Sequence, residues 1–228
     1  MKKNALLFLL IIVVSGLMSC SNIEKPAEKT IKTNEEPNQK QNKNNNTTFQ
    51  NGDIIFQISL SGQGKAIQLA TKSNYTHCGL IVEKNNQFYV FEAETHVKAI
   101  RLKKWIERGK NQHFVVKRLK NAEKILTKTM IENITKQILK YNEKRYDIYF
   151  SWSDEAMYCS ELVWKIYQKA TGIEVGNLQK LKDFDLTSNE VKQKLKERYG
   201  NNIPLEEKVI SPESIFKSDK LEEITIKY

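Results

Sequence analysis

Three residues in this 228-residue chain could together support nucleophilic catalysis: Cys159, His77 and Glu92. Cys159 stands just before apolar residues at helical spacing (162–170), which places its thiol in the first turn of a helix. There the backbone dipole and unpaired N–H groups favour the thiolate, and a cysteine pKa can fall from ~8.5 to roughly 3.5–7.5. We therefore predict that Cys159 is a nucleophile; a buried thiol at a helix start is the alternative.

The histidine and the carboxylate are predicted to meet across a β-hairpin. Two apolar runs, residues 78–83 and 88–94, are joined by a polar turn centred near Asn85 and Asn86. This turn places His77 opposite the region of Glu92 and Glu94, on one face of the hairpin. The carboxylate would bind one ring nitrogen and orient the imidazole, and the other ring nitrogen would face the thiol. A structural or surface histidine is the alternative.

The other cysteine of the folded region and the other histidines have simpler explanations. Alternation points Cys78 away from His77, so we expect a small core residue and no disulfide with Cys159. His96 and His113 lack a favourable cross-strand carboxylate. No cluster of side chains has metal-site spacing, so we expect neither a metal nor another cofactor.

The chain is expected to divide into three parts. Two lysines and a short apolar run make residues 1–20 an export signal rather than a membrane span, which needs about 20 apolar residues. Residues 21–50 are rich in Asn, Lys, Glu and Gln and are predicted to form a disordered linker. Residues 51–228 suffice for one domain with a sizeable core, expected to be a monomer. The lysines behind the net charge of +10 are scattered, so we expect no nucleic-acid partner.

The end of the signal region resembles the lipobox of bacterial lipoproteins. The tetrapeptide Leu17-Met18-Ser19-Cys20 follows the apolar run directly. This resemblance implies that Cys20 is lipidated and holds the mature protein at a membrane of the bacterial cell envelope, facing the periplasm or the exterior. An ordinary signal peptide or an uncleaved anchor is the alternative.

Several motifs of the main domain resemble those of NlpC-type cysteine peptidases. They are the Gly-Asp strand at residues 51–56, the His-Cys-Gly-Leu strand at 76–81, the strand at 90–93, Tyr146, and Tyr-Cys-Ser-Glu-Leu-Val at 158–163. The cysteine follows the histidine instead of preceding it. That order resembles the YiiX/YebB-like permuted papain-like hydrolases, and lecithin:retinol acyltransferase-type enzymes share it. The resemblance extends from Asn51 to about Leu221.

The resemblance implies an α+β, permuted papain-like fold with an antiparallel sheet packed against helices. It implies Cys159 as nucleophile, His77 as base, Glu92 as the third polar residue and Tyr146 near the oxyanion hole. Glu161 replaces a glycine of the NlpC enzymes and is expected to make the cleft rim more acidic. The aromatic stretch 146–152 is expected to form one wall of the cleft.

These inferences predict a thiol hydrolase, an amidase or peptidase that cleaves an amide bond in cell-wall peptide or in an acyl-amide of the envelope. The same thiolate could serve a lipid-directed thioesterase or acyltransferase, which is one alternative. A non-catalytic envelope-binding module on the same scaffold is the other, disfavoured because all three catalytic residue types are present.

Overall fold

The computed structural model describes residues 48–226 of the chain. The predicted signal peptide with Cys20, and residues 21–47 of the predicted linker, lie outside the described residues. Phe49 is buried in a core cluster with Ile55 and Trp105, so the packed chain begins before the expected boundary at Asn51. None of the helices within residues 48–226 is long and apolar enough to cross a membrane.

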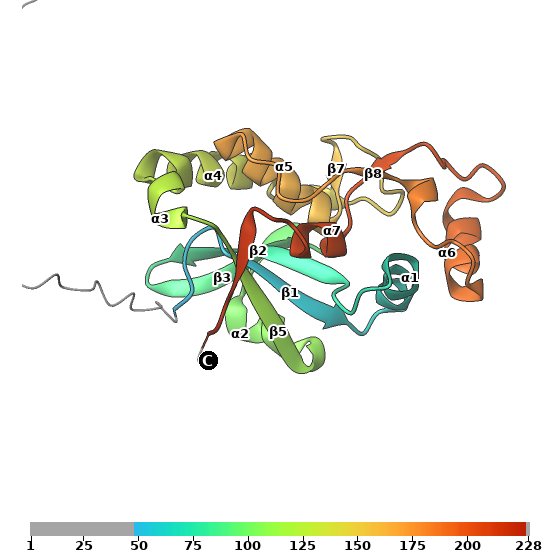
Figure 1. The fold of residues 1–228 in the computed structure, drawn as a ribbon, viewed down its shortest axis with the longest axis horizontal. Coiled ribbons are helices and arrows are strands. Elements are labelled where there is room, and N and C mark those ends of the chain that lie inside the picture. Colours follow the sequence, from blue (N-terminus) through green and yellow to red (C-terminus); the bar gives the residue numbers. More distant parts are fainter. Residues whose placement is uncertain (1–47, 227–228) are drawn as a thin grey trace, which may run out of the picture. The chain divides into compact units, whose positions relative to one another are not determined.

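A six-stranded antiparallel sheet forms the centre of the described domain, which confirms the α+β class (Figure 1). Alternating apolar residues build its strands, and Asn85 and Asn86 take positive φ in the turn between β2 and β3, as a two-residue hairpin turn requires. In sheet order the strands are β10 (Leu221–Ile224), β5 (Gly109–Leu119), β1 (Ile54–Ser59), β2 (His77–Lys84), β3 (Gln87–Ala93) and β4 (Val97–Arg101).

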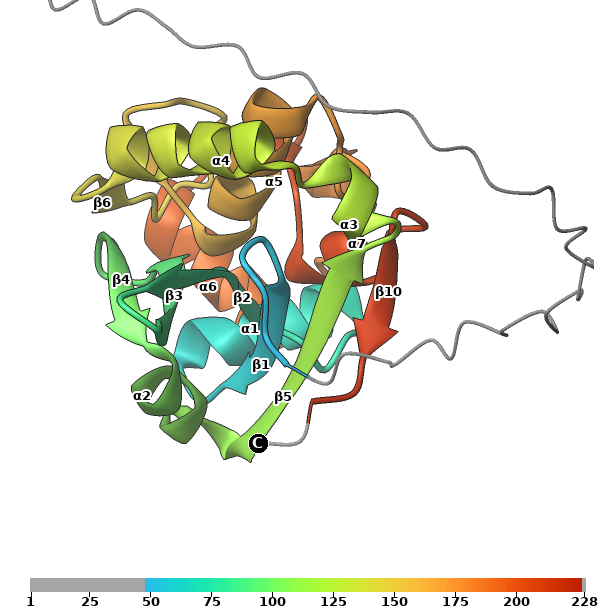
Figure 2. The ribbon, with the colours of Figure 1, turned by 90° about the vertical axis from the view of Figure 1, so that its left-hand side faces the viewer.

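Helices cover both faces of this sheet, with α4 and α5 on one side and α2 on the other (Figure 2). The helices are α1 (Gly62–Thr71), α2 (Leu102–Glu107), α3 (Ala122–Ile125), α4 (Lys128–Tyr141), α5 (Cys159–Thr171), the 3₁₀ helix η1 (Leu181–Asp183), α6 (Asn189–Tyr199) and α7 (Pro212–Phe216). Two short ladders pair β6 (Arg145–Tyr146) with β7 (Ala156–Met157) and β8 (Gln179–Lys180) with β9 (Lys208–Val209).

Strand alternation divides the core into two main clusters, one on each face of the sheet. Cys78 and Leu80 of β2 face the cluster that holds Leu162 and Val163 of α5. Ile81 of β2 faces the other cluster, with Trp105 and Ile106 of α2. A third, smaller cluster joins α1 to α6 through residues that include Ala66, Val191 and Leu195.

In the sequence, apolar residues at mostly helical spacing over residues 121–141 predict one helix. The structure divides it in two: α3 ends at Ile125 and α4 begins at Lys128. The hydroxyl of Thr127 accepts a hydrogen bond from the Met130 N–H, which makes Thr127 the N-cap of a new helix.

Candidate active site

The structure places Cys159 at the first residue of α5, as the sequence predicts. Its neighbours tie this helix start to the chain before α7: the Ser160 hydroxyl donates to the Ile210 carbonyl oxygen at 2.7 Å, and the Ile210 N–H donates to the Tyr158 hydroxyl at 3.1 Å. Cys159 itself is largely buried. Its sulfur therefore lies in the field of a helix N-terminus that is held in place by tertiary hydrogen bonds.

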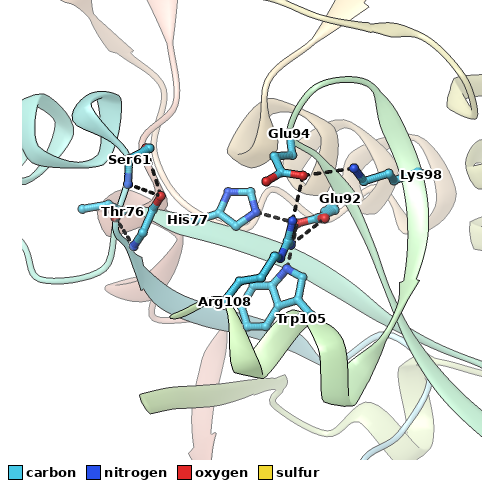
Figure 3. A network of polar contacts seen from close by, with 9 residues as sticks. Ser61, Thr76, His77, Glu92, Glu94, Lys98, Trp105 and Arg108 are labelled. Atoms are coloured by element: carbon cyan, nitrogen blue, oxygen red, sulfur yellow. Dashed lines mark hydrogen bonds and ion pairs between the residues drawn. The ribbon is translucent and has the colours of Figure 1, made fainter. Parts of the chain in front are cut away.

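His77 and Glu92 meet across the hairpin (Figure 3). The His77 Nε2 atom lies 2.6 Å from Glu92 Oε2, which leaves Nδ1 to face Cys159. The ring stacks on Trp105 with a centroid distance of 5.9 Å, and Glu92 is completely buried. Gly79 has no side chain to obstruct the neighbouring strand β3, where a Cβ would lie 2.3 Å from a Val90 methyl carbon.

Two further residues, which the sequence analysis did not identify, hold Glu92 in place (Figure 3). The Trp105 indole N–H donates to Glu92 Oε2 at 2.8 Å, and Arg108 donates to Oε1 at 2.7 Å and to Oε2 at 2.8 Å. Arg108 also pairs with Glu94 at 2.7 Å. Three donor groups, from β2, from α2 and from its C-cap, thus converge on one buried carboxylate.

The pKa values of the thiol and the imidazole are displaced in opposite directions. Burial alone would lower the pKa of His77, but the Cys159 thiolate and the Glu92 carboxylate raise it to about 10. A hydrogen bond from the Cys78 thiol, with the attraction of the His77 imidazolium, outweighs burial and holds the pKa of Cys159 well below its usual range. These shifts favour a thiolate–imidazolium pair at neutral pH.

Cys78 is a core residue that also touches the site. It is fully buried on the α5 side of the sheet, opposite to the His77 face, and it is a free cysteine. Burial and the neighbouring Cys159 thiolate raise its pKa well above the usual range. Cys78 is therefore a neutral thiol whose proximity to Cys159 helps to lower the pKa of that residue, an effect that its alternation pattern did not indicate.

Tyr146 is held beside Cys159 by the β6–β7 ladder, in which it pairs with Met157. Its hydroxyl oxygen accepts a hydrogen bond from the Gln63 amide nitrogen, and the Gln63 amide oxygen accepts one from Arg198 at 2.8 Å. Burial and the Cys159 thiolate raise the pKa of Tyr146. Gln63 and Arg198 lie on α1 and α6, far apart in the sequence, and no local pattern singles them out.

Two cavities meet at Cys159, and Tyr146, Gln63 and Ile67 also line both. The first has an empty volume of about 770 Å³ and almost wholly apolar walls from α1, η1, α6 and the chain before α7. The second has an empty volume of about 880 Å³ and polar walls that include His77, Glu94 and Arg108. The thiol thus stands between an apolar and a polar space.

Of two expectations about the cleft, the one for Glu161 is wrong and the one for the aromatic stretch 146–152 holds in part. Glu161 does not reach the cleft rim: it is fully buried behind Cys159 and pairs with Lys165 at 2.8 Å, one helical turn further along. Within the stretch 146–152, Tyr146 and Phe150 line the apolar cavity, whereas Trp152 packs against Trp164 at a centroid distance of 5.4 Å.

His96 and His113 stay apart from this arrangement. His96 contacts the exposed Glu143 at 3.8 Å, and His113 contacts the Tyr75 hydroxyl at 3.4 Å. Neither histidine lines the two cavities around Cys159.

The comparisons with known proteins agree with this geometry. Residues 48–225 match the family of permuted papain-like amidases of the YaeF/YiiX type, the C92 family. The chain belongs to this family. The uncharacterized protein YiiX of Escherichia coli strain K12 is 51% identical over 172 residues, 75% of this chain and 84% of the relative. A crystal structure described as the metalloprotein YiiX from Escherichia coli O157:H7 is 50% identical, with a TM-score of 0.74, and covers 78% of this chain and 98% of its own.

The fold is therefore permuted papain-like, with the histidine strand before the cysteine helix. The description of the E. coli structure as a metalloprotein belongs to that protein. In residues 48–226 of this chain, no three His, Cys, Asp or Glu side chains are grouped to hold a metal ion. His77 Nε2 is bonded to Glu92, whose oxygens are also bonded by Arg108 and Trp105. The described residues do not fit a metal centre at this site.

Proposed function

We propose that the protein is a cysteine amidase that uses Cys159 as nucleophile, His77 as acid and base, and Glu92 as the carboxylate that orients His77. The observation that carries the proposal is geometric: His77, whose Nε2 lies 2.6 Å from Glu92 Oε2, lines the polar cavity together with Cys159 at the start of α5. The directions of the pKa shifts agree with this geometry, because the pKa of Cys159 is lowered and that of His77 is raised. A thiolate beside an imidazolium is the reactive form of a cysteine hydrolase.

In the first half of the proposed reaction the Cys159 thiolate attacks the amide carbonyl carbon, and the carbonyl electrons move to oxygen. The backbone N–H of Cys159 at the start of α5 and the Tyr146 hydroxyl stabilise this oxyanion. When the tetrahedral intermediate collapses, the C–N bond breaks and His77 Nδ1 gives its proton to the leaving nitrogen. The acyl group remains on Cys159 as a thioester.

In the second half a water molecule resolves the thioester. Neutral His77 takes a proton from the water through Nδ1 while the oxygen attacks the acyl carbon. The C–S bond then breaks, the acid product leaves, and the thiolate–imidazolium pair is restored. Glu92 keeps Nε2 protonated and directed away from the thiol throughout both halves.

The cavities support an amide that joins an acyl group to a polar amine. His77 must lie on the leaving-group side because it protonates the nitrogen, and His77 lines the polar cavity. The acyl side then extends toward the apolar cavity. Cell-wall peptide and acyl-amides of the envelope are the two substrate classes within this proposal. The apolar cavity also favours a second candidate, a thioesterase or acyltransferase that acts on lipid acyl chains.

A direct comparison of substrates tests this proposal. Purified protein would be incubated with peptidoglycan fragments, N-acyl amines and lipid esters, with Cys159→Ala as the blank. Amide cleavage that requires Cys159 is the expected result. Turnover of the esters alone would contradict the amidase assignment and favour the lipid-directed thioesterase or acyltransferase. If no substrate is turned over, both enzyme assignments are contradicted and a binding module is favoured.

We also propose that lipidated Cys20 holds the protein at an envelope membrane. The support is the lipobox-like tetrapeptide that ends in Cys20, behind the apolar run of the signal region. Cys20→Ala should move the protein from the membrane fraction to the soluble fraction while leaving its melting temperature unchanged. Unmodified Cys20 in intact, soluble wild-type protein would contradict the anchor.

A further inference from the structure

We propose that Gln63, fixed by Arg198, is a positioning residue that directs the Tyr146 hydroxyl proton toward the reacting carbonyl oxygen. The inference rests on the proposed function, in which Tyr146 stabilises the oxyanion. It concerns a chain of hydrogen bonds that runs from α6 through α1 to the cysteine.

The three residues come from distant parts of the sequence and meet beside Cys159. Tyr146 lies next to the start of α5 because β6 pairs with β7. Gln63, in the first turn of α1, donates to the Tyr146 oxygen from its amide nitrogen. Arg198, near the end of α6, donates to the Gln63 amide oxygen at 2.8 Å, and its guanidinium lies 4.5 Å from the centre of the Phe150 ring.

The polarity of this chain follows from the donors that each group possesses. A guanidinium can only donate, so the Gln63 amide must turn its oxygen toward Arg198 and its nitrogen toward Tyr146. The amide nitrogen can also only donate, so the Tyr146 oxygen must accept there. The hydroxyl proton of Tyr146 is thereby left for an acceptor on another side.

That acceptor lies at the junction of the two cavities. Tyr146, Gln63 and Cys159 all line both spaces, so a carbonyl attacked by the thiolate would stand within this group. Burial and the thiolate raise the pKa of Tyr146, which keeps its hydroxyl protonated. A pre-aimed O–H donor in a buried site contributes most when negative charge develops on the substrate oxygen.

The variant Gln63→Glu tests the polarity without changing the size of the side chain. A carboxylate accepts from both sides, so it would keep the contact with Arg198 but would draw the Tyr146 proton toward itself. Gln68→Glu is the matched control, because Gln68 lies on the same helix and contacts Lys65 and Asn74 instead. Gln63→Leu, which removes the hydrogen bonds to Tyr146 and Arg198 without adding charge, is a second variant.

Two reactions of Cys159 separate this role from a general effect on the thiolate. Acylation by p-nitrophenyl acetate passes through an oxyanion, whereas alkylation by iodoacetamide does not. Gln63→Glu should slow acylation by about 100-fold, as Tyr146→Phe should, while alkylation stays close to the wild-type rate. In a Tyr146→Phe background, Gln63→Glu should change acylation by less than about twofold, because both act through one hydroxyl.

Three results would overturn the inference: wild-type acylation in both Gln63 variants, an equal loss of acylation and alkylation in Gln63→Glu, or additive losses in the combined variant. Acylation of wild-type protein that does not exceed that of Cys159→Ala would instead contradict the proposed function itself, and the inference with it.

Discussion

Two fully buried glutamates flank the cysteine, and they differ in what surrounds them. Glu92 accepts hydrogen bonds from His77, Trp105 and Arg108 on the α2 side of the sheet. Glu161, inside α5, pairs with Lys165, which it shares with Asp154 and the Ser153 carbonyl. Both are 0% exposed.

The number and kind of donors decides the charge of each group. Burial raises the pKa of Glu92, but bonds from His77 and the charges of His77 and Arg108 outweigh it, so the pKa is lowered. For Glu161, burial outweighs the Lys165 ammonium and raises the pKa to about 8. The comparison teaches that a buried carboxylate is held as an anion where several strong donors converge on it.

The largest expected difference between the two glutamates is in catalysis. Glu92→Gln should lower kcat/KM by roughly 100- to 10,000-fold, because the amide no longer fixes the tautomer or stabilises the imidazolium of His77. The matched variant Glu161→Gln should retain nearly wild-type kcat/KM. Steady-state rates on an amide that the wild type cleaves measure both, and equal losses in the two variants would break the comparison.

A smaller effect is expected from the donors around Glu92. Trp105→Phe should lower kcat/KM by about tenfold, the value of one hydrogen bond to a charged group, and Arg108→Met, which removes bonds to both Glu92 oxygens, by at least as much. Arg108→Met should also move the acid limb of the pH–rate profile to higher pH, because Glu92 loses a charge that lowers its pKa. The control is Arg101→Met, since Arg101 contacts Gln87 and not Glu92. An unchanged profile for Arg108→Met would contradict this account.

The smallest expected effect is on stability, and its sign differs between the two glutamates. The pKa of Glu161 is about 8 in the folded protein against an ordinary 4.5. Between these two pH values the folded protein therefore keeps a proton on Glu161 that the unfolded chain loses. The free energy of unfolding should therefore fall as pH rises through that window, by up to ~1.4 kcal/mol per pH unit. The lowered pKa of Glu92 has the opposite effect. Its contribution to the free energy of unfolding is present above pH 4.5 and is lost as pH falls through the pKa of Glu92 in the folded protein.

Urea unfolding of the wild type and Glu161→Gln between about pH 5 and 8 measures the first of these effects. The variant should lack the decline toward pH 8 that the wild type shows. Parallel curves would show that Glu161 is already ionised at the lower pH.

The local patterns of the sequence predicted the parts of the site that short-range geometry determines. Alternation across a tight turn brought His77 to Glu92, and an apolar helical pattern placed Cys159 at a helix start. Trp105, Arg108 and Gln63 could not be found this way, because their partners lie on other elements, and Gln63 stands 135 residues from Arg198.

Two predictions that the structure corrects, the position of Glu161 and the single helix over residues 121–141, could have been avoided from the sequence. Glu161 and Lys165 are four residues apart, the spacing of an ion pair along one helix face, which favours a position inside the fold rather than on the cleft rim. Thr127 stands where an N-cap would divide the helix predicted for residues 121–141.

The pH dependence of thiol alkylation tests the central claim most directly. Iodoacetamide labelling of Cys159 and Cys78 would be followed by mass spectrometry in the wild type and in His77→Ala. Cys159 should react at about pH 6, well below the ~8.5 of an ordinary thiol, while Cys78 stays unlabelled until the protein unfolds. His77→Ala should lose the reaction at low pH. Equal labelling of the two cysteines at every pH, or a disulfide between them, would contradict the assignment of Cys159 as the nucleophile.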